Sequence, residues 1–315
     1  MSTLFSHFFQ NINQISPLEA NFTEVLDTIA LKPKTLYFYG KMPENVSKNE
    51  DLRIGLSPKS ERKKAVAIVG SRRNTRYGEE IAYNLAYALA KRGVVIVSGL
   101  AYGIDSIGHR AALDAGGTTV AVLGTPIDEI YPKNHEPLAR EIVEKGGAII
   151  SEYAPGAKIY PKTSFLERNR LISGLSDIVV VVEAAERSGT LNTAAHALNQ
   201  GRDVFAVPGN ITSPYSKGCN RLIAQGAYPY TEPDDILRLL FPEDYHKPKK
   251  STSKSLIGDT DYETAILKAL ASGLRSGEDL MRETGLSPEV FSQTLTLLEI
   301  KGRLRPLGAN NWTLN

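Results

Sequence analysis

Four short segments of the sequence contain residue types that can bind anions, such as glycine, serine, threonine, lysine and arginine. The first is Gly70-Ser71-Arg72, followed by Arg73 and Arg76. Glycine lets backbone N–H groups approach an anion, a nearby helix start adds partial positive charge, and arginines add full charges. The spacing matches neither a P-loop nor a dinucleotide fingerprint. The segment therefore predicts a phosphate cradle of another kind, with a tight turn carrying solvated arginines as the alternative.

The second segment follows the next apolar run and is rich in small residues. Backbone N–H groups in such a turn can bind phosphate oxygens, and two glycine-bearing turns form a polyanion site more readily than one. Asp105, which ends the segment, is expected to cap the next helix or to hold the loop. The residues expected to face phosphates are Ser98, Gly99, Leu100, Ala101 and Gly103.

The third segment places cations beside an aromatic ring. Its candidate contacts are Lys162, Phe165, Arg168, Asn169 and Arg170. Cations neutralise phosphates and a ring stacks on a base, and single-stranded nucleic acid is bound by this combination. In the alternative interpretation the two arginines pair with internal carboxylates and the phenylalanine belongs to the core.

The fourth segment, Ser188-Gly189-Thr190, offers hydroxyl groups and backbone N–H groups at the start of a predicted helix. Such a start can bind another phosphate. The same residues can instead serve as an N-cap and nothing more. Both interpretations stay open on the sequence alone.

The sequence offers no catalytic or metal-binding constellation. Its five histidines lack a His-x3-His spacing, and no Gly-x-Ser-x-Gly motif occurs. Glu183 is a lone acid at a strand end, which is weak support for acid–base chemistry. The single cysteine, Cys219, excludes an internal disulfide framework and a cysteine-based zinc site. We therefore expect no catalytic residue, no metal and no cofactor.

The four segments must be positioned by the strands that precede them. Short runs rich in Val and Ile, without polar alternation, are typical of strands covered on both faces. Between the runs lie helical patterns, such as residues 79–91, which Gly93 ends. This alternation predicts an α/β fold with a mostly parallel sheet, helices on both faces and ligands beyond the carboxyl ends of the strands. The runs are residues 65–69, 94–97, 118–123, 148–151, 177–183 and 203–207.

Four parts are predicted along the chain. Residues 1–60 form an N-terminal appendage, residues 61–243 the sheet domain, residues 244–257 a basic linker and residues 258–315 a small domain. Three helical patterns followed by two short strands predict a winged helix for the last part. Six basic and eight acidic residues make that part net acidic, whereas a reader of duplex DNA needs a basic face. We expect it to contact protein or to stay passive, and not to form a second DNA site.

The composition is that of a globular protein. Hydrophobic residues make up 42% and charged residues 23% of the 315 residues, which excludes a wholly disordered or collagen-like chain. No apolar run approaches the ~20 residues that span a bilayer, and the first 31 residues lack the basic start of a secretory signal. We therefore expect a cytoplasmic protein without membrane contact. Residues 65–240 carry 18 basic and 18 acidic residues, so anion binding there must be local.

Seven strings, which contain all but Lys162 and Phe165 of these candidate contacts, together resemble the DNA-processing protein A (DprA/Smf) family. They occur in the family's order and cover about residues 65–230. One departure is Phe165-Leu166-Glu167, where the family commonly has Phe-Pro-x. The other concerns the sterile-alpha-motif-like domain with which many members open, which we expect to be abridged or absent here. The matching strings are residues 68–72, 98–105, 168–176, 182–184, 188–194, 201–209 and 218–226.

The resemblance implies an extended Rossmann-like domain that binds single-stranded DNA and forms homodimers. It also implies protection of incoming DNA and loading of the RecA recombinase during natural transformation, without enzymatic activity. The residues that carry over as DNA contacts are Arg72, Lys162 and Phe165, with the loop from Ser98 to Gly103 giving N–H groups to phosphates. The family's C-terminal winged helix matches the outline predicted here.

Two rival functions come from other classes. Glycine turns also hold mononucleotides, so the chain could be a small-nucleotide-binding enzyme or sensor similar to the lysine-decarboxylase-like Rossmann group. That group uses a Pro-Gly-Gly-x-Gly-Thr loop with a following Glu, and residues 188–193 lack the acid. A transcription regulator acting through the winged helix would need duplex binding by residues 258–315, against which the charge count argues.

Overall fold

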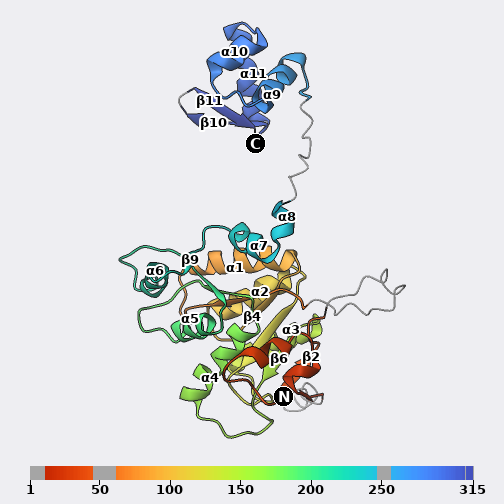
Figure 1. The fold of residues 1–315 in the computed structure, drawn as a ribbon, viewed down its shortest axis with the longest axis vertical. Coiled ribbons are helices and arrows are strands. Elements are labelled where there is room, and N and C mark those ends of the chain that lie inside the picture. Colours follow the sequence, from red (N-terminus) through yellow and green to blue (C-terminus); the bar gives the residue numbers. More distant parts are fainter. Residues whose placement is uncertain (1–10, 45–61, 247–256, 309, 315) are drawn as a thin grey trace, which may run out of the picture. The chain divides into compact units, whose positions relative to one another are not determined.

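A nine-stranded sheet forms the centre of the computed structural model, which describes residues 11–44, 62–246, 257–308 and 310–314 (Figure 1). The strand order is β1-β2-β6-β5-β4-β3-β7-β8-β9. Strands β3 to β9 pair in parallel, whereas β2 runs antiparallel to β6 and β1 antiparallel to β2. The strands are β1 (Asn13–Ile15), β2 (Leu36–Gly40), β3 (Ala65–Val69), β4 (Val95–Ser98), β5 (Thr119–Leu123), β6 (Ala148–Ser151), β7 (Ile178–Val181), β8 (Asp203–Ala206) and β9 (Tyr228–Pro229).

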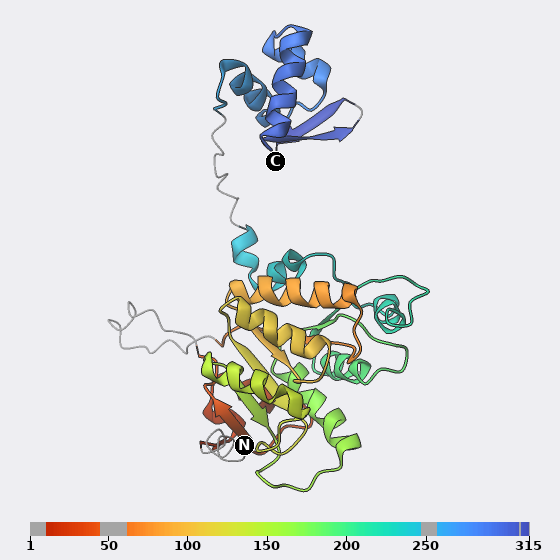
Figure 2. The same cartoon turned by 180° about the vertical axis from the view of Figure 1, so that it is seen from behind.

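Helices cover both faces of this sheet. Helices α1, α2 and α3 pack on one face, which is in front in Figure 2, and α4 and α5 pack on the other face. The predicted α/β fold with a mostly parallel sheet is therefore confirmed. The helices of this part are η1 (Pro17–Glu19), η2 (Glu24–Thr28), α1 (Arg76–Lys91), α2 (Ile104–Asp114), η3 (Lys133–His135), α3 (Glu136–Glu144), α4 (Pro161–Gly174), α5 (Thr190–Asn199), α6 (Lys217–Ala224) and α7 (Pro233–Leu240). Helix α8 (Pro242–His246) begins at the boundary with the second compact unit.

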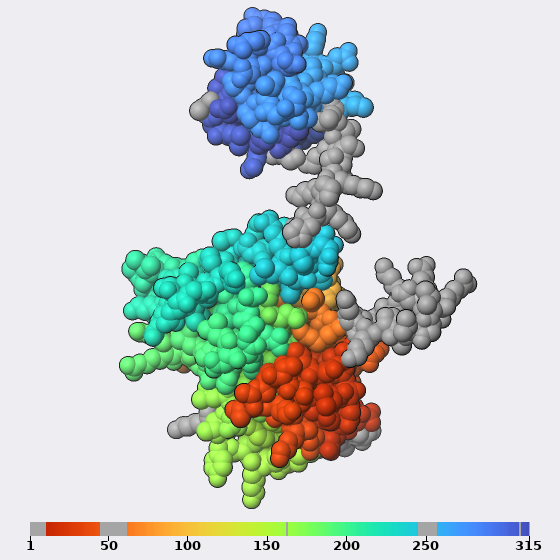
Figure 3. All heavy atoms as spheres, viewed as in Figure 1, coloured from red at the N-terminus to blue at the C-terminus, as the bar shows by residue number. Residues whose placement is uncertain are grey.

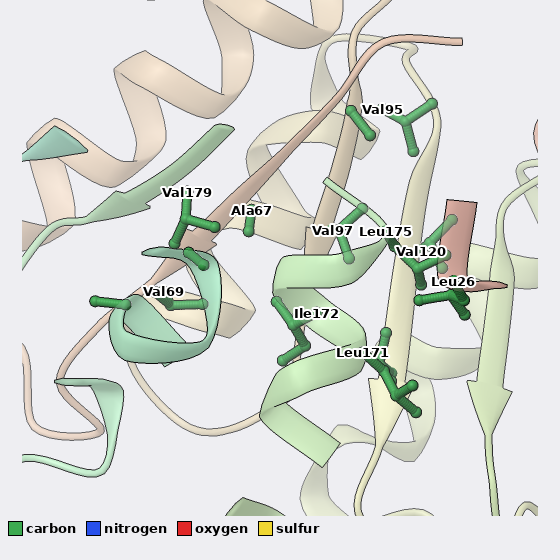
Figure 4. Packing of buried hydrophobic residues seen from close by; sticks show 14 of the residues in the cluster. Leu26, Ala67, Val69, Val95, Val97, Val120, Leu171, Ile172, Leu175 and Val179 are labelled. Carbon is green, nitrogen blue, oxygen red and sulfur yellow. The ribbon is translucent and has the colours of Figure 1, made fainter. Parts of the chain in front are cut away.

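The core lies between the central strands and the helices. All residues of β3, β4, β5, β6 and β7 are buried, as the continuous apolar runs predicted. Val69, Val97 and Val179 belong to one cluster with Leu171 and Ile172 of α4 (Figure 4). Burying each such side chain contributes roughly 1.5–3 kcal/mol. The packing fixes α4 across the carboxyl half of the sheet.

The N-terminal segment is part of this core, so its prediction as an appendage is wrong for the described residues. β2 pairs with β6, and Phe22, Leu26 and Leu36 are almost fully buried. Leu26 lies so close to α4 that a methyl group on Gly174 would come within 2.8 Å of it. The apolar side chains of the segment complete the core under α4, and its residues, drawn in red, form part of the surface (Figure 3).

The strand order reverses at β3. From β3 the chain builds β4, β5 and β6 in one direction, and α4 then carries it back so that β7 pairs with the other side of β3. In open parallel sheets a crevice forms at such a reversal, outside the carboxyl ends of the two strands. The crevice expected here lies between the loops after β3 and β7.

The second compact unit, Glu243–Asn315, holds the predicted winged helix. Lys301, the C-cap residue of its longest helix, contacts the carboxylates of Asp259 (2.7 Å) and Glu263 (2.6 Å). The expected linker, residues 244–257, falls mostly outside the described residues. No helix of the described residues is long and apolar enough to cross a membrane. The elements are α9 (Asp261–Ala271), α10 (Gly277–Thr284), α11 (Pro288–Ile300), β10 (Leu304–Gly308) and β11 (Asn311–Leu314).

A histidine on α2 is fully buried between that helix and the sheet. The Nδ1 atom of His109 lies 2.7 Å from the hydroxyl oxygen of Thr119, which itself donates to the carbonyl oxygen of Ile96. The Nε2 atom has no partner among the described residues. Burial, helped by His135 and Arg168, lowers the pKa of His109 to about 3. The native protein therefore holds this imidazole neutral.

We expect acid to destabilise the protein through His109. Below pH 6.5 the unfolded chain takes up a proton that the folded chain cannot accept until about pH 3. This residue should lower the free energy of unfolding by roughly 1.4 kcal/mol per pH unit in that window. His109→Gln should be less stable at pH 8 and should show a shallower loss between pH 6.5 and 5 in urea titrations. Equal slopes in both proteins would contradict the assignment.

Candidate nucleic-acid interface

A cavity of about 400 Å³ lies at the reversal point between β3 and β7, and we call it the crevice. It brings together the first, third and fourth segments that the sequence singled out, and part of the second. Its lining residues are Val69, Gly70, Ser71, Arg72, Arg73, Ala101, Asp105, Phe165, Leu166, Arg168, Asn169, Ile172, Ala185, Ser188, Gly189, Thr190, Thr193 and Tyr215.

The loop after β3 forms one wall of the crevice. The Thr190 hydroxyl donates to the carbonyl oxygen of Gly70 (3.0 Å), and the N–H of Ile104 donates to that of Ser71 (3.2 Å). These bonds fix the loop to α5 and α2. Arg72 is exposed and makes no ion pair with another described residue, and its guanidinium carbon lies 5.7 Å from the centre of the Phe165 ring.

The N-terminus of α1 is already occupied by an acid of the chain. The buried carboxylate of Glu183 accepts the backbone N–H (2.9 Å) and the hydroxyl (2.5 Å) of Thr75, the N-cap residue. A methyl group on Gly78 would lie 2.4 Å from this carboxylate. The expected contribution of this helix start to phosphate binding is therefore replaced by an internal cap, and Glu183 is structural.

The loop after β4 is held from inside, which corrects several expected contacts. The Ser98 hydroxyl donates to the carbonyl oxygen of Ile68 (2.6 Å), and Leu100 is fully buried with a φ of 59°. The N–H of Gly99 donates to the buried carboxylate of Asp105 (3.1 Å), whose pKa burial raises. These groups face the interior and support the loop.

Two other members of the second segment lie nearer the surface. Ala101 is half-buried and lines the crevice. Gly103 is half-buried and immediately precedes α2, with a φ of 76°. Of the five residues expected to face phosphates in this segment, Ala101 is the one that lines the crevice, and its backbone N–H donates to Asp105.

Arg168 lines the buried floor of the crevice. Its Nη1 atom donates to the carbonyl oxygens of Gly99 (2.8 Å) and Val122, and the residue is 5% exposed. Burial lowers the pKa of its guanidinium to about 10, so it keeps its charge at neutral pH. The expected direct DNA contact is corrected: the acceptors are main-chain carbonyls, and Arg168 adds positive charge to the floor of the crevice.

The other predicted residues of α4 divide between the crevice and the interior. Asn169 lines the crevice and donates from its amide to Asn192 (3.2 Å). Arg170 is 9% exposed, pairs with Glu152 (2.5 Å) and does not line the crevice, which corrects its expected role. Phe165 is half-buried at the rim. Lys162 lies in the first turn of the helix, and its side chain is outside the described part of the structure.

The loop after β7 forms the opposite wall. The N–H of Thr190 donates to the hydroxyl of Ser188 (3.2 Å), and Gly189 is the exposed N-cap of α5. Two further lining residues, Thr193 and Tyr215, were not predicted. Tyr215 follows β8, and its carbonyl oxygen accepts the N–H of Ala184. Only the three-dimensional path of the chain brings this tyrosine to the site.

Comparison with known proteins identifies the family. A family model described as DNA recombination-mediator protein A matches residues 13–241. The chain belongs to this family. A second model, the DprA winged helix domain, matches residues 249–310. The resemblance to DprA/Smf proteins that the sequence motifs predicted is thereby confirmed.

Curated relatives match over part of their length. The putative DNA processing protein DprA of Mycobacterium tuberculosis is 40% identical over 245 residues, which are 76% of this chain and 61% of the relative. Protein Smf of Escherichia coli is 50% identical over 179 residues, 56% of this chain and 46% of the relative. The matches thus span about half to three fifths of the length of these relatives.

Two solved structures have a similar fold. DNA processing protein A from Streptococcus pneumoniae is 37% identical with a TM-score of 0.60, covering 74% of this chain and 75% of that one. The Helicobacter pylori protein, whose structure describes a single-stranded DNA binding mode, is 30% identical with a TM-score of 0.61. This match covers 76% of this chain and 98% of that one.

We expect Glu183 to contribute to stability. Glu183→Ala should leave the N–H of Thr75 without its acceptor, which lowers the free energy of unfolding by roughly 1–3 kcal/mol. Glu183→Gln keeps an acceptor oxygen and should lose less. The exposed Glu186 on the same loop provides the matched control, and Glu186→Ala should unfold at the wild-type urea concentration. Wild-type stability of Glu183→Ala would refute the capping role.

Proposed function

We propose that this protein binds single-stranded DNA at the crevice, without sequence selectivity and without changing the strand chemically. The observation that carries the proposal is the pair formed by Arg72 and Phe165 at the rim. The guanidinium carbon of Arg72 lies 5.7 Å from the centre of the Phe165 ring. An exposed cation beside a partly exposed ring suits an alternating chain of phosphates and bases. Sequence-tolerant binding follows because every base has a face that can stack.

Charge distribution supports a flexible polyanion as the ligand. Residues 65–240 carry equal numbers of basic and acidic residues, yet Arg72 and Arg73 are exposed at the crevice and Arg168 lies beneath it. On the opposite wall the start of α5 presents Gly189 and Thr190. Cations on one side and a helix start on the other can bind neighbouring phosphates of one strand.

The crevice favours binding over catalysis. Among its described lining residues Asp105 is the one carboxylate, and it is 6% exposed. It accepts the N–H groups of Gly99 and Ala101 and lies near Arg168. A carboxylate committed to the loop in this way is poorly placed to accept a substrate proton. This supports a binder rather than the rival nucleotide enzyme.

The family supports the wider part of the proposal. The Helicobacter pylori relative binds single-stranded DNA, as its structure's description states. By this kinship we extend the proposal to a cytoplasmic homodimer that protects incoming DNA and delivers it to the RecA recombinase during transformation. For the winged helix we propose a protein contact or a passive role, because Lys301 is held by Asp259 and Glu263.

We expect Arg72→Ala to weaken binding of an oligothymidylate about tenfold at low salt, because one phosphate contact is lost. The slope of log affinity against log salt should become shallower by about 0.7, the value for one contact on a single strand. Fluorescence anisotropy between about 50 and 200 mM salt measures both quantities. Lys91→Ala is the matched control, since Lys91 is an exposed cation at the C-terminal end of α1 and does not line the crevice. An unchanged salt slope in Arg72→Ala would show that Arg72 does not contact a phosphate.

We expect Phe165→Ala to reduce the binding free energy by roughly 1–3 kcal/mol if a base stacks on the ring. Phe165→Tyr keeps the ring and should bind as the wild type does. Titration with a mononucleotide distinguishes the proposed DNA binding from the rival function, a small-nucleotide enzyme. Affinity that grows with oligonucleotide length supports the proposal, whereas turnover of a nucleoside monophosphate would replace it with the nucleotide enzyme.

A further inference from the structure

A second, much smaller depression adjoins the crevice. This depression shares Arg72, Ala101, Phe165 and Arg168 with the crevice and adds Gly99, Tyr102, Tyr131 and Pro132. The described surface is therefore continuous from the start of α5, across the rim, to the loops before α2 and η3. A strand that lies in the crevice can leave it in this direction.

Two exposed tyrosines border the depression. Tyr131 is 47% exposed and Tyr102 is 44% exposed. The ring of Tyr131 packs against Phe165, with centroids 5.3 Å apart and planes tilted by 47°. The Tyr131 ring thus extends the aromatic surface of Phe165 outward, away from the crevice.

The ring of Tyr102 is also supported by a neighbouring ring. Tyr102 packs edge-on against His135, with centroids 4.8 Å apart. The Nδ1 atom of His135 lies 2.7 Å from the carbonyl oxygen of Leu100, which fixes the imidazole under the loop. Both tyrosines are therefore supported from one side and open on the other, as a stacking platform requires.

The charge around these rings suits the same ligand. Among the described residues that line the depression, none is acidic, while Arg72 and Arg168 are cationic. The groove between α1 and α2 differs, because Glu79 and Glu80 lie in its lining. Aromatic faces beside arginines without acids favour a strand with accessible bases over a protein segment of mixed charge.

We propose that Tyr131 and Tyr102 form a second base-stacking subsite, for the nucleotides that follow those in the crevice. This inference rests on the proposed function, and it specifies the direction in which the bound strand leaves the crevice. The bound species is an unpaired strand, because the bases of a duplex are stacked on one another and cannot cover these rings. The subsite raises the affinity only of strands long enough to reach it.

The test compares oligothymidylates of increasing length, from a dinucleotide upward, by fluorescence anisotropy. Tyr131→Ala and Tyr102→Ala should bind the shortest strands as the wild type does. Beyond a threshold length each should bind more weakly, by roughly 5- to 150-fold, the range for one stacked base. Tyr131→Phe and Tyr102→Phe should keep wild-type affinity. Tyr87→Ala removes an exposed tyrosine of α1 outside both depressions and should change nothing.

A strand-side experiment needs no variant and so does not depend on how the variants fold. A long strand whose outer residues are abasic keeps the phosphates but offers no rings to the tyrosines. Wild-type protein should bind it at least as weakly as Tyr131→Ala binds the intact strand, because both tyrosines lose their bases. Equal affinity for abasic and intact strands, alanine variants that match the wild type at every length, or equal losses at all lengths would overturn the subsite. Failure of the wild type to bind any strand would instead refute the proposed function.

Discussion

The buried guanidinium of Arg168 is the interaction on which the crevice depends. It joins α4 to the loop after β4 and to β5 through the carbonyl oxygens of Gly99 and Val122. Moving a cation out of water is unfavourable, and the two carbonyls and the nearby Asp105 offset that cost. A methyl group on Gly99 would come within 2.3 Å of the guanidinium, so the loop must pass this close. Because α4 also carries Phe165, the same contact positions the ring at the rim.

Two carboxylates of the chain take positions that phosphates could otherwise occupy. Asp105 accepts an N–H of the loop after β4, and Glu183 accepts the N–H of the residue that caps α1. Both loops are therefore ordered before any ligand arrives, and little conformational entropy is lost on binding. The groups that remain to bind a polyanion lie nearer the surface, at Arg72 and at the start of α5. The crevice is thus a preformed site whose inner layer is structural.

The strands and the winged helix could be predicted because they leave local patterns in the sequence. Strands covered on both faces are continuous apolar runs, and residues 65–69 and 148–151 have the predicted bounds. The burial of Arg168 could not be predicted, because its acceptors are main-chain carbonyls 69 and 46 residues away. Any residue type offers a carbonyl, so such a partner has no sequence signal. The place of the N-terminal segment depends in the same way on a pairing with β6 that only the folded chain reveals.

The pairing of β2 with β6 has a consequence for synthesis on the ribosome. Tyr37 lies opposite Ser151, so the earlier strand is made more than a hundred residues before its partner. At ordinary elongation rates of about 5–20 residues per second, the nascent strand waits for roughly 6 to 23 seconds. During that time Phe22, Leu26 and Leu36 have no core to enter. This apolar segment therefore stays without its native neighbours in β6 and α4 until those elements have been translated.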